Sequence, residues 1–139
     1  MAKYCKIILY ALMLLIPTAC DNSDDIGDLL GIWKLKEMTV AGETIKPENL
    51  YLCFQDKLAD ARIVDYSEHI SSDVFGNYTH SADSLHIMFY CDANEQDPTY
   101  WMNQYKFYDF SNLHFKIETL NSKEMLLRSN NDLWHFVKN

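Results

Sequence analysis

Glycine and proline are scarce in this sequence, and their scarcity excludes whole classes of protein. Among 139 residues there are 4 glycines and 3 prolines, too few for a collagen-like or low-complexity chain. Hydrophobic residues make up 48% and aromatic residues 14% of the chain, which is enough to fill a core and excludes wholesale disorder. The length suits a single domain.

Positive charge is also in short supply. The chain has 12 Lys and Arg against 20 Asp and Glu, which gives a net charge of −8. Two of the lysines, Lys3 and Lys6, lie in a leader without acids, so removal of the leader takes the net charge to −10. A surface of this sign repels phosphate backbones, and nucleic acid is therefore excluded as a partner.

Motifs of catalytic and metal sites are missing as well. There is no Gly-x-Ser-x-Gly, no Cys-x-x-Cys and no His-x₃-His. The five histidines are scattered, and His114 and His135 fall opposite the apolar residues of their segments, which predicts that they face solvent. The many carboxylates fit a solvated acidic surface. We therefore expect no enzyme activity, no metal and no cofactor.

Hydrophobic runs long enough to span a bilayer are absent too. The apolar run from Ile7 to Ile16 has ten residues, against the roughly 20 that a spanning helix needs. It follows two lysines and precedes small residues, which is the layout of a secretory signal. The letters "TAC" that end at Cys20 resemble the end of a bacterial lipobox. This resemblance implies a signal peptide over residues 1–19 and palmitate-type acyl chains on Cys20 as a membrane anchor.

An acidic stretch without apolar periodicity, Asp21 to Asp25, follows the cysteine. It reads as a solvated spacer, and "CDNSDD" also resembles the acidic export signal of lipoproteins on the outer face of the outer membrane. We expect residues 20–30 to form a lipidated tether. The expected location is the outer membrane of a Gram-negative bacterium, with the protein exposed at the cell surface.

From Gly31 onward, apolar and polar residues alternate, which is typical of strands with one buried face. About eight such segments are separated by turn signals such as Asp56-Lys57 and Ala82-Asp83. Because crossovers of the length that parallel strands need are missing, we predict an all-β, antiparallel, up-and-down barrel over residues 31–139. The side chains expected to point inward are Trp33, Leu35, Leu50, Leu52, Phe54, Ala61, Ile63, Gly76, Tyr78, Leu85, Ile87, Phe89, Leu113, Phe115, Ile117, Met125, Leu127, Trp134 and Phe136.

Three stretches of this segment resemble the lipocalin (calycin) superfamily. "GIWKL" is similar to the Gly-x-Trp in which the tryptophan plugs the closed end of the barrel. "FGNYTHSADSLHI" and "EMLLRSNNDLWHFVK" look like two hairpins of small lipocalin-like bacterial lipoproteins. The resemblance covers Gly31 to Lys138 and implies an eight-stranded barrel, which is wide enough either to be filled by its own side chains or to hold one small ligand.

The longest connection between strands, from Cys91 to Phe110, is rich in aromatic residues. Asp97-Pro98 suits the start of a helix, which would place Trp101, Tyr105 and Tyr108 on one face. An extended conformation, with Tyr105 and Phe107 alternating, is the other interpretation. The rings either cover one end of the barrel or line its mouth, where Tyr and Trp can stack on a sugar or an apolar ligand.

Two functions follow from these alternatives. A ligand-binding module would hold a small apolar or glycan ligand, and the lipocalin resemblance favours this interpretation. The candidate ligand contacts are Trp33, Phe54, Tyr78, Phe89, Phe115, Tyr100, Trp101 and Tyr105. In the other interpretation the same residues form a solid core, and the outer surface of a structural or interaction module meets an envelope protein.

Two covalent features are also expected outside the leader. Cys53 and Cys91 can form a disulfide in an oxidising compartment, or remain two separate thiols. Asp83-Ser84-Leu85 is similar to an O-glycosylation acceptor of exported bacterial proteins and lies at an expected hairpin turn. Ser84 is therefore a candidate glycosylation site, with ordinary turn chemistry as the alternative.

Overall fold

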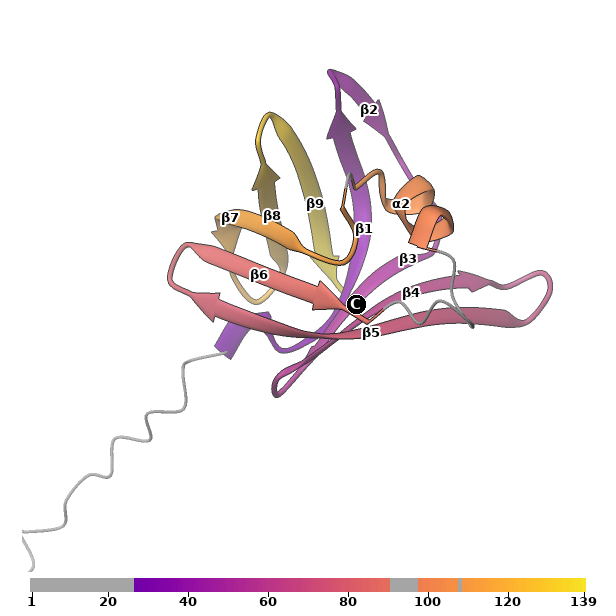
Figure 1. Ribbon diagram of the computed structural model, residues 1–139, viewed down its shortest axis with the longest axis horizontal. Helices are drawn as coiled ribbons and strands as arrows, with labels where there is room; N and C mark the ends of the chain where they lie inside the picture. Colours follow the sequence, from indigo (N-terminus) through magenta and orange to yellow (C-terminus); the bar gives the residue numbers. More distant parts are fainter. Residues whose placement is uncertain (1–26, 91–97, 108) are drawn as a thin grey trace, which may run out of the picture.

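The computed structural model describes residues 27–90, 98–107 and 109–139, which form a β-barrel with one helix beside it (Figure 1). The elements are η1 (Gly27–Leu29), β1 (Gly31–Val40), β2 (Glu43–Ile45), β3 (Leu50–Gln55), β4 (Leu58–Asp65), β5 (Ile70–Ser81), β6 (Ser84–Phe89), α2 (Pro98–Tyr105), β7 (Leu113–Leu120), β8 (Glu124–Ser129) and β9 (Asp132–Lys138). The expected signal peptide and Cys20 lie outside the described residues. Among those that are described, no helix has the length and apolar character that crossing a bilayer requires.

Eight strands close the barrel, and each pairs antiparallel with its neighbours. β1 pairs with β3, every strand from β3 to β9 pairs with the next, and β9 returns to β1. β2 is a ninth strand, added to the last residues of β1 through pairs such as Met38 with Ile45. The predicted antiparallel, up-and-down barrel is confirmed. No alternating pattern marks β2 in the sequence, because this strand is three residues long and mostly exposed.

Short turns at the expected positions join the strands. Asp56 and Asn130 adopt positive φ angles of 51° and 54° in the turns that follow β3 and β8. Asp and Asn tolerate this left-handed conformation because their short polar side chains can hydrogen-bond locally. The turn residues thus fix the hairpin positions and, with them, the register of the sheet.

The side chains expected inside the barrel are buried, except for Ile63, which is partly buried against the core. Gly76 has a special role in this packing. A Cβ at Gly76 would overlap the backbone carbonyl of Met88 and lie 2.7 Å from the Cα of Phe89. β5 and β6 therefore approach each other at a distance that only glycine permits.

One end of the barrel is closed by η1 and Trp33. The indole Nε1–H of Trp33 donates a hydrogen bond to the carbonyl of Leu29 over 2.8 Å, and both residues are fully buried. The sequence pattern places Leu29 in the tether, whereas the packed domain begins before Gly31. The reason is local: the 3₁₀ turn carries the leucine back over the tryptophan ring.

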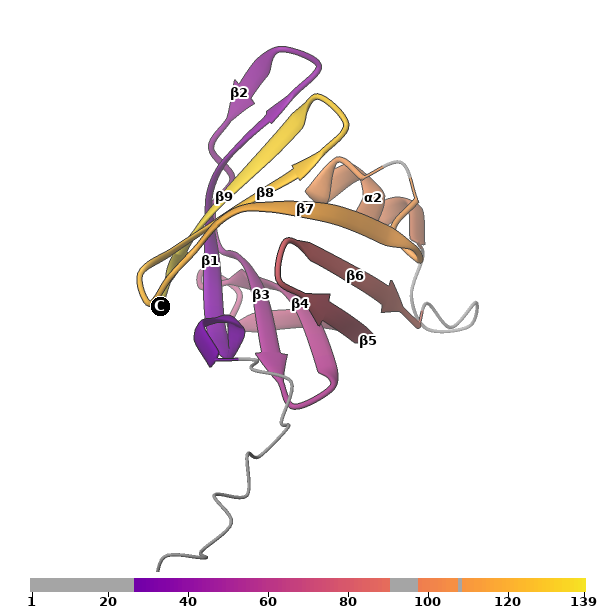
Figure 2. The ribbon, with the colours of Figure 1, turned by 90° about the vertical axis from the view of Figure 1, so that its left-hand side faces the viewer.

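The helix α2 covers the end opposite η1 (Figure 2) and lies near the start of β3 (Figure 1). Trp101 and Tyr105 lie on its buried face, while Asn103 and Gln104 are exposed. The helical interpretation of this segment is therefore confirmed for Pro98–Tyr105, and the extended one is wrong there. Tyr108, expected on the same face, lies outside the described residues.

Candidate functional site

Most of the predicted ligand contacts lie inside the barrel, packed against other rings. Trp33, Phe54, Tyr78, Phe89 and Phe115 are at most 7% exposed. Phe54 meets Tyr78 edge to face with ring centroids 5.0 Å apart, and Phe89 stacks on Phe110 at 4.6 Å. These side chains therefore occupy the barrel interior themselves.

The two buried rings of α2 extend this cluster at the covered end. The Tyr105 hydroxyl donates to the carbonyls of Tyr51 and Arg62, at 2.7 and 3.2 Å. Burial raises the pKa of this hydroxyl well above its ordinary value. Trp101 stacks near Tyr105 with ring centroids 6.3 Å apart, whereas Tyr100 points outward and is 44% exposed. The helix is thus fastened to β3 and β4 as a cover.

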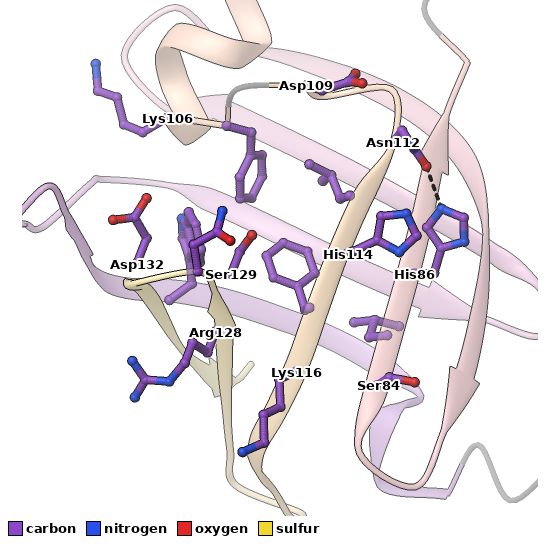
Figure 3. A pocket seen from close by; sticks show the side chains of 16 residues that line it. Ser84, His86, Lys106, Asp109, Asn112, His114, Lys116, Arg128, Ser129 and Asp132 are labelled. Carbon is purple, nitrogen blue, oxygen red and sulfur yellow. Dashed lines mark hydrogen bonds between the residues drawn. The ribbon is translucent and has the colours of Figure 1, made fainter.

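The barrel wall has an opening between β7 and the turn that joins β8 to β9 (Figure 3). β7 begins at Leu113, but its pairing with β8 begins at Lys116, opposite Arg128. The first residues of β7 therefore have no β8 partner, because β8 ends at Ser129. The resulting pocket has a volume of about 640 Å³.

Three aromatic side chains form the floor of this opening. Phe107 and Trp134 lie with ring centroids 4.9 Å apart, and Phe115 meets Trp134 edge to face at 5.5 Å. The indole Nε1–H of Trp134 donates to the carbonyl of Tyr105 over 3.4 Å. The floor is therefore built from the same ring cluster that fills the barrel interior.

Polar side chains surround the floor. They come from β6, the start of β7, the β8–β9 turn and the chain after α2: His86, Asn112, His114, Ser129, Asn130, Asp132, Lys106 and Asp109. Figure 3 places the labelled members around the rim of the opening. An apolar aromatic floor with hydroxyl, amide and imidazole groups around it suits a small ligand with one apolar face, such as a sugar ring.

The cations at the rim are engaged elsewhere or lie at its edge. Arg128 Nε is 2.7 Å and Lys116 Nζ 3.7 Å from the same carboxylate oxygen of Glu118. The hydrogen bond from Arg128 lowers the pKa of Glu118. Arg128 and Lys116 are thus turned to the outer wall, and the rim that remains combines neutral hydrogen-bonding groups with Lys106, Asp109 and Asp132.

His86 and His114 form a stacked pair beside the opening. They lie directly opposite each other on β6 and β7, with ring centroids 3.9 Å apart and planes 7° from parallel. His86 Nε2 is 2.6 Å from Asn112 Oδ1. The histidine spacing in the sequence hides this pair, because the register of two different strands brings the rings together. His114 is exposed as expected, and His135 is partly buried.

Phe107 and Trp134 are not among the predicted ligand contacts, although both line the opening. Trp134 was expected to point inward, whereas Phe107 was named only in the extended interpretation of its segment; both are buried, Phe107 at 6% and Trp134 at 2% exposure. A strand pattern identifies an inward side chain, but it does not reveal where the neighbouring strand stops. The signal that was available is the difference in strand length, since β7 has eight residues and β8 six.

The expected covalent sites lie elsewhere on the barrel. Cys53 is a partly buried thiol on the outer face of β3, and burial, helped by the nearby Asp60, raises its pKa to about 11. Its suggested disulfide partner, Cys91, lies outside the described residues. Ser84 is exposed after the β5–β6 turn, with its hydroxyl 2.5 Å from that of Ser81. Glycosylation of Ser84 stays a prediction.

Potential metal ligands are dispersed over the described ranges of the chain. Within them, His, Cys, Asp and Glu side chains form no group of three that could hold a metal ion.

Comparison with known proteins assigns the chain to a family. The family model described as lipocalin-like domain matches residues 12–139. A lipocalin-like protein from Bacteroides uniformis ATCC 8492 has a crystal structure similar to this fold, with a TM-score of 0.70 and 22% sequence identity over 81% of this chain and 100% of that chain. The crystal structure of an uncharacterized protein from Bacteroides eggerthii DSM 20697 gives a TM-score of 0.69 and 22% identity, with the same shares covered. A comparison with curated proteins gives no match. On the family match and the closed eight-stranded barrel together, the chain belongs to the lipocalin-like domain family, whose architecture suggests a ligand-binding module.

Proposed function

We propose that this protein is a lipid-anchored lipocalin-like binding protein, and that its small ligand enters the opening between β7 and the β8–β9 turn. The observation that carries the proposal is the aromatic floor of Phe107, Phe115 and Trp134 beneath a rim of polar side chains. Rings of this kind stack on the apolar face of a sugar or hold a small apolar molecule, while the rim supplies hydrogen bonds that orient it. No catalytic step is part of the proposal.

The cellular location is part of the same proposal and is supported by the sequence. A charged and apolar leader ends at Cys20, whose thiol can carry a diacylglycerol while its new amino group takes a further acyl chain. Several chains together anchor stably where one chain binds only marginally. The acidic residues after the cysteine support exposure at the surface of the outer membrane. The intact mass of protein isolated from its native membrane tests the anchor.

The floor of the opening supplies its own probe. Trp134 lines the pocket, whereas Trp33 lies at the end closed by η1 and Trp101 on the buried face of α2. A ligand that covers the floor should change the emission of Trp134 during titration with neutral oligosaccharides and small apolar molecules. The same titration of Trp134→Phe should lose that change.

Native mass spectrometry of protein isolated from cells would identify a retained ligand. Ser129 stands at the end of β8, on the rim. Ser129→Phe fills the opening and should abolish the retained mass, whereas Ser122→Phe, at the exposed β7–β8 turn, should keep it. Absence of a retained mass from the unaltered protein, together with unchanged Trp134 emission for the whole panel, would contradict ligand binding here.

The packed interior favours a second candidate function, a non-catalytic envelope module that binds a protein partner through its outer surface. Side chains from every barrel strand join one buried cluster, and α2 adds Trp101 and Tyr105 to it. In this case a cross-linked envelope protein should remain bound to Ser129→Phe, and no small-molecule mass should accompany either form. The two candidates therefore differ in the unaltered protein, which retains a small-molecule mass under the first and none under the second.

A further inference from the structure

One side of the barrel carries exposed apolar side chains where a solvated wall would carry polar ones. Six large apolar residues point outward from β1, β4, β5, β6 and the residues beside them, and each is between 41% and 60% exposed. We call them the apolar face: Leu30, Ile32, Leu58, Phe75, Met88 and Tyr90. Single exposed apolar residues are ordinary, whereas a contiguous group indicates a surface that is covered in use.

Strand register brings the members of the apolar face into two neighbouring rows. Ile32 is opposite Cys53, Cys53 opposite Asp60, and Asp60 opposite Phe75, so one row of side chains crosses four strands. The amide of Tyr90 extends this row by donating to the carbonyl of Phe75 over 2.8 Å. The adjacent row runs from Leu58 through Asn77 to Met88. A hollow of about 520 Å³ lies among Leu30, Ile32, Leu58 and Phe75.

The wall on the far side of the barrel differs in character. In the order of eight strands around the barrel, β8 stands four strands from β4. The outer face there carries the ion pairs of Arg128 and Lys116 with Glu118, and a contact of 3.3 Å between His135 Nε2 and Glu124 Oε2. The apolar face is therefore a one-sided feature of the fold.

The charged groups at the apolar face are already paired with one another. Arg62 donates to Asp60 over 2.7 Å and to Asp73 over 2.5 Å. The other Asp60 oxygen, Oδ1, is buried without a hydrogen-bond partner in the described part of the chain, and burial raises the pKa of this carboxyl to about 6. The face thus presents apolar and aromatic groups over an ion-pair cluster, which suits an apolar cover better than a charged one.

The short segment between Cys20 and Gly27 limits how far the apolar face can lie from a membrane that holds Cys20. Seven residue steps separate Cys20 from Gly27, and an extended chain of that length spans at most about 25 Å. The chain enters the barrel through η1, beside the start of β1 and the end of β3 (Figure 2). Leu30 and Ile32, the first two members of the apolar face, follow at once. A bilayer that holds Cys20 is therefore within reach of this wall.

We propose that the apolar face rests on the lipid surface to which Cys20 is anchored. This inference rests on the proposed lipid anchor and adds an orientation to it. The exposed aliphatic side chains enter the boundary between headgroups and acyl chains, as the apolar side of an interfacial helix does. Tyr90 lies at the headgroup level, which tyrosine favours, with Phe75 beside it. The wall of β7, β8 and β9, with the ligand opening, then faces away from the membrane.

A tryptophan on the apolar face reports this contact. Mature protein with Phe75→Trp, isolated with its acyl chains, is placed in phosphatidylcholine vesicles with bromine atoms on the acyl chains near the headgroups. An interfacial depth of about 5–10 Å brings the new indole to the quencher, so its emission should fall by about half relative to unbrominated vesicles. The unaltered protein, whose described tryptophans are all buried, supplies the background.

A matched reporter stands on the far wall. Leu126 is a partly buried, outward-facing residue of β8, and Leu126→Trp should keep its emission in brominated vesicles. Adding Ile32→Ser and Leu58→Ser to Phe75→Trp should restore much of the lost emission, while the acyl chains keep the protein on the vesicle. Both serines are placed at exposed positions, so the fold should be unchanged. The near-ultraviolet circular dichroism of the buried tryptophans checks this independently.

Three results would overturn the orientation, and each has a different meaning. If the protein carries acyl chains but the indole of the Phe75→Trp variant is not quenched, the docking is wrong while the anchor stands. If the intact mass shows no acyl group on Cys20, both the anchor and the docking are wrong. If the emission of the same variant shifts to shorter wavelength without lipid as the protein dimerises, a second copy covers the face in place of the bilayer.

Discussion

The ammonium group of Lys138 lies over the ring of Trp33, with Nζ 4.3 Å from the ring centroid. The same Nζ donates to the carbonyls of Asp28, over 2.8 Å, and of Leu30. One lysine near the end of the chain thus stacks on the tryptophan that closes the barrel and satisfies two backbone carbonyls beside it. Desolvation of this group lowers the pKa of Lys138.

Lys138→Met should remove the charge and both hydrogen bonds while keeping a side chain over the indole. We expect the free energy of unfolding to fall by about 1–2 kcal/mol, because a cation over an indole and hydrogen bonds from a charged donor each contribute on that scale. Chemical denaturation followed by intrinsic tryptophan fluorescence measures the change. Lys123→Met, at an exposed turn position, is the control and should change stability little.

Gly76→Ala should be among the most destabilising single substitutions in the barrel. The added methyl group overlaps the carbonyl of Met88, which is backbone, so β5 and β6 must separate to admit it. We expect a loss of about 3 kcal/mol or more, measured as a fall in Tm. Gly42→Ala is the matched control, since a Cβ at Gly42 meets open space and the cost there is that of a positive φ, about 1–2 kcal/mol. Equal losses for the two variants would contradict the steric account.

Asp60 should make stability depend on pH in an unusual direction. Burial raises the pKa of its carboxyl from 3.8 to about 6 in the folded protein. Because the folded state holds this proton more tightly than the unfolded state, the contribution to stability is full below about pH 4 and declines as pH rises toward and past 6. The difference amounts to about 3 kcal/mol in total.

Asp60→Asn should remove this dependence and gain stability relative to the unaltered protein as pH rises from 4 to 7, measured by denaturation at each pH. Asp65 supplies a control of opposite sign. Hydrogen bonds from Ser67 and Glu68 lower the pKa of this exposed carboxyl, so its stabilising effect is lost as pH falls. Parallel pH curves for the unaltered protein and Asp60→Asn would refute the buried-acid account.

Tyr105→Phe should loosen the helical cover without altering the ring packing. The variant loses the hydroxyl that donates to the carbonyls of Tyr51 and Arg62 in a buried position. We expect a cost of about 1–3 kcal/mol, because buried carbonyls are left without this donor. Amide exchange should quicken in α2 before it does in β3. Tyr100→Phe, on the exposed side of the same helix, is the control. If amide exchange in α2 also quickens in Tyr100→Phe, the effect is a general loss of stability.

Alternation and turn chemistry were sufficient to predict the barrel. Each inward set, such as Leu85, Ile87 and Phe89 on β6, follows from the period of two that one buried face imposes. The helix start at Pro98 was also visible, because proline suits the first turn of a helix, and the competing extended interpretation fails there.

The opening in the wall was not predictable in the same way. It exists because the β7–β8 ladder begins at Lys116, and register between two strands is a property of neither strand alone. The stacked pair of His86 and His114 has the same origin. The buried position of Leu29 depends on a three-residue turn that carries no periodic signal. Local pattern therefore identifies the faces of strands, while relations between strands come from the assembled sheet.

The pairing of β1 with β9 has a consequence for how the chain can reach its folded state. β1 is synthesised first and β9 last, so the barrel cannot close until the whole domain has been made. The contacts that close it join residues far apart in the sequence. Deleting the seven residues of β9 would strip a partner from β1 and from β8 at once. Such a truncated protein would expose two unpaired strand edges, which are templates for aggregation.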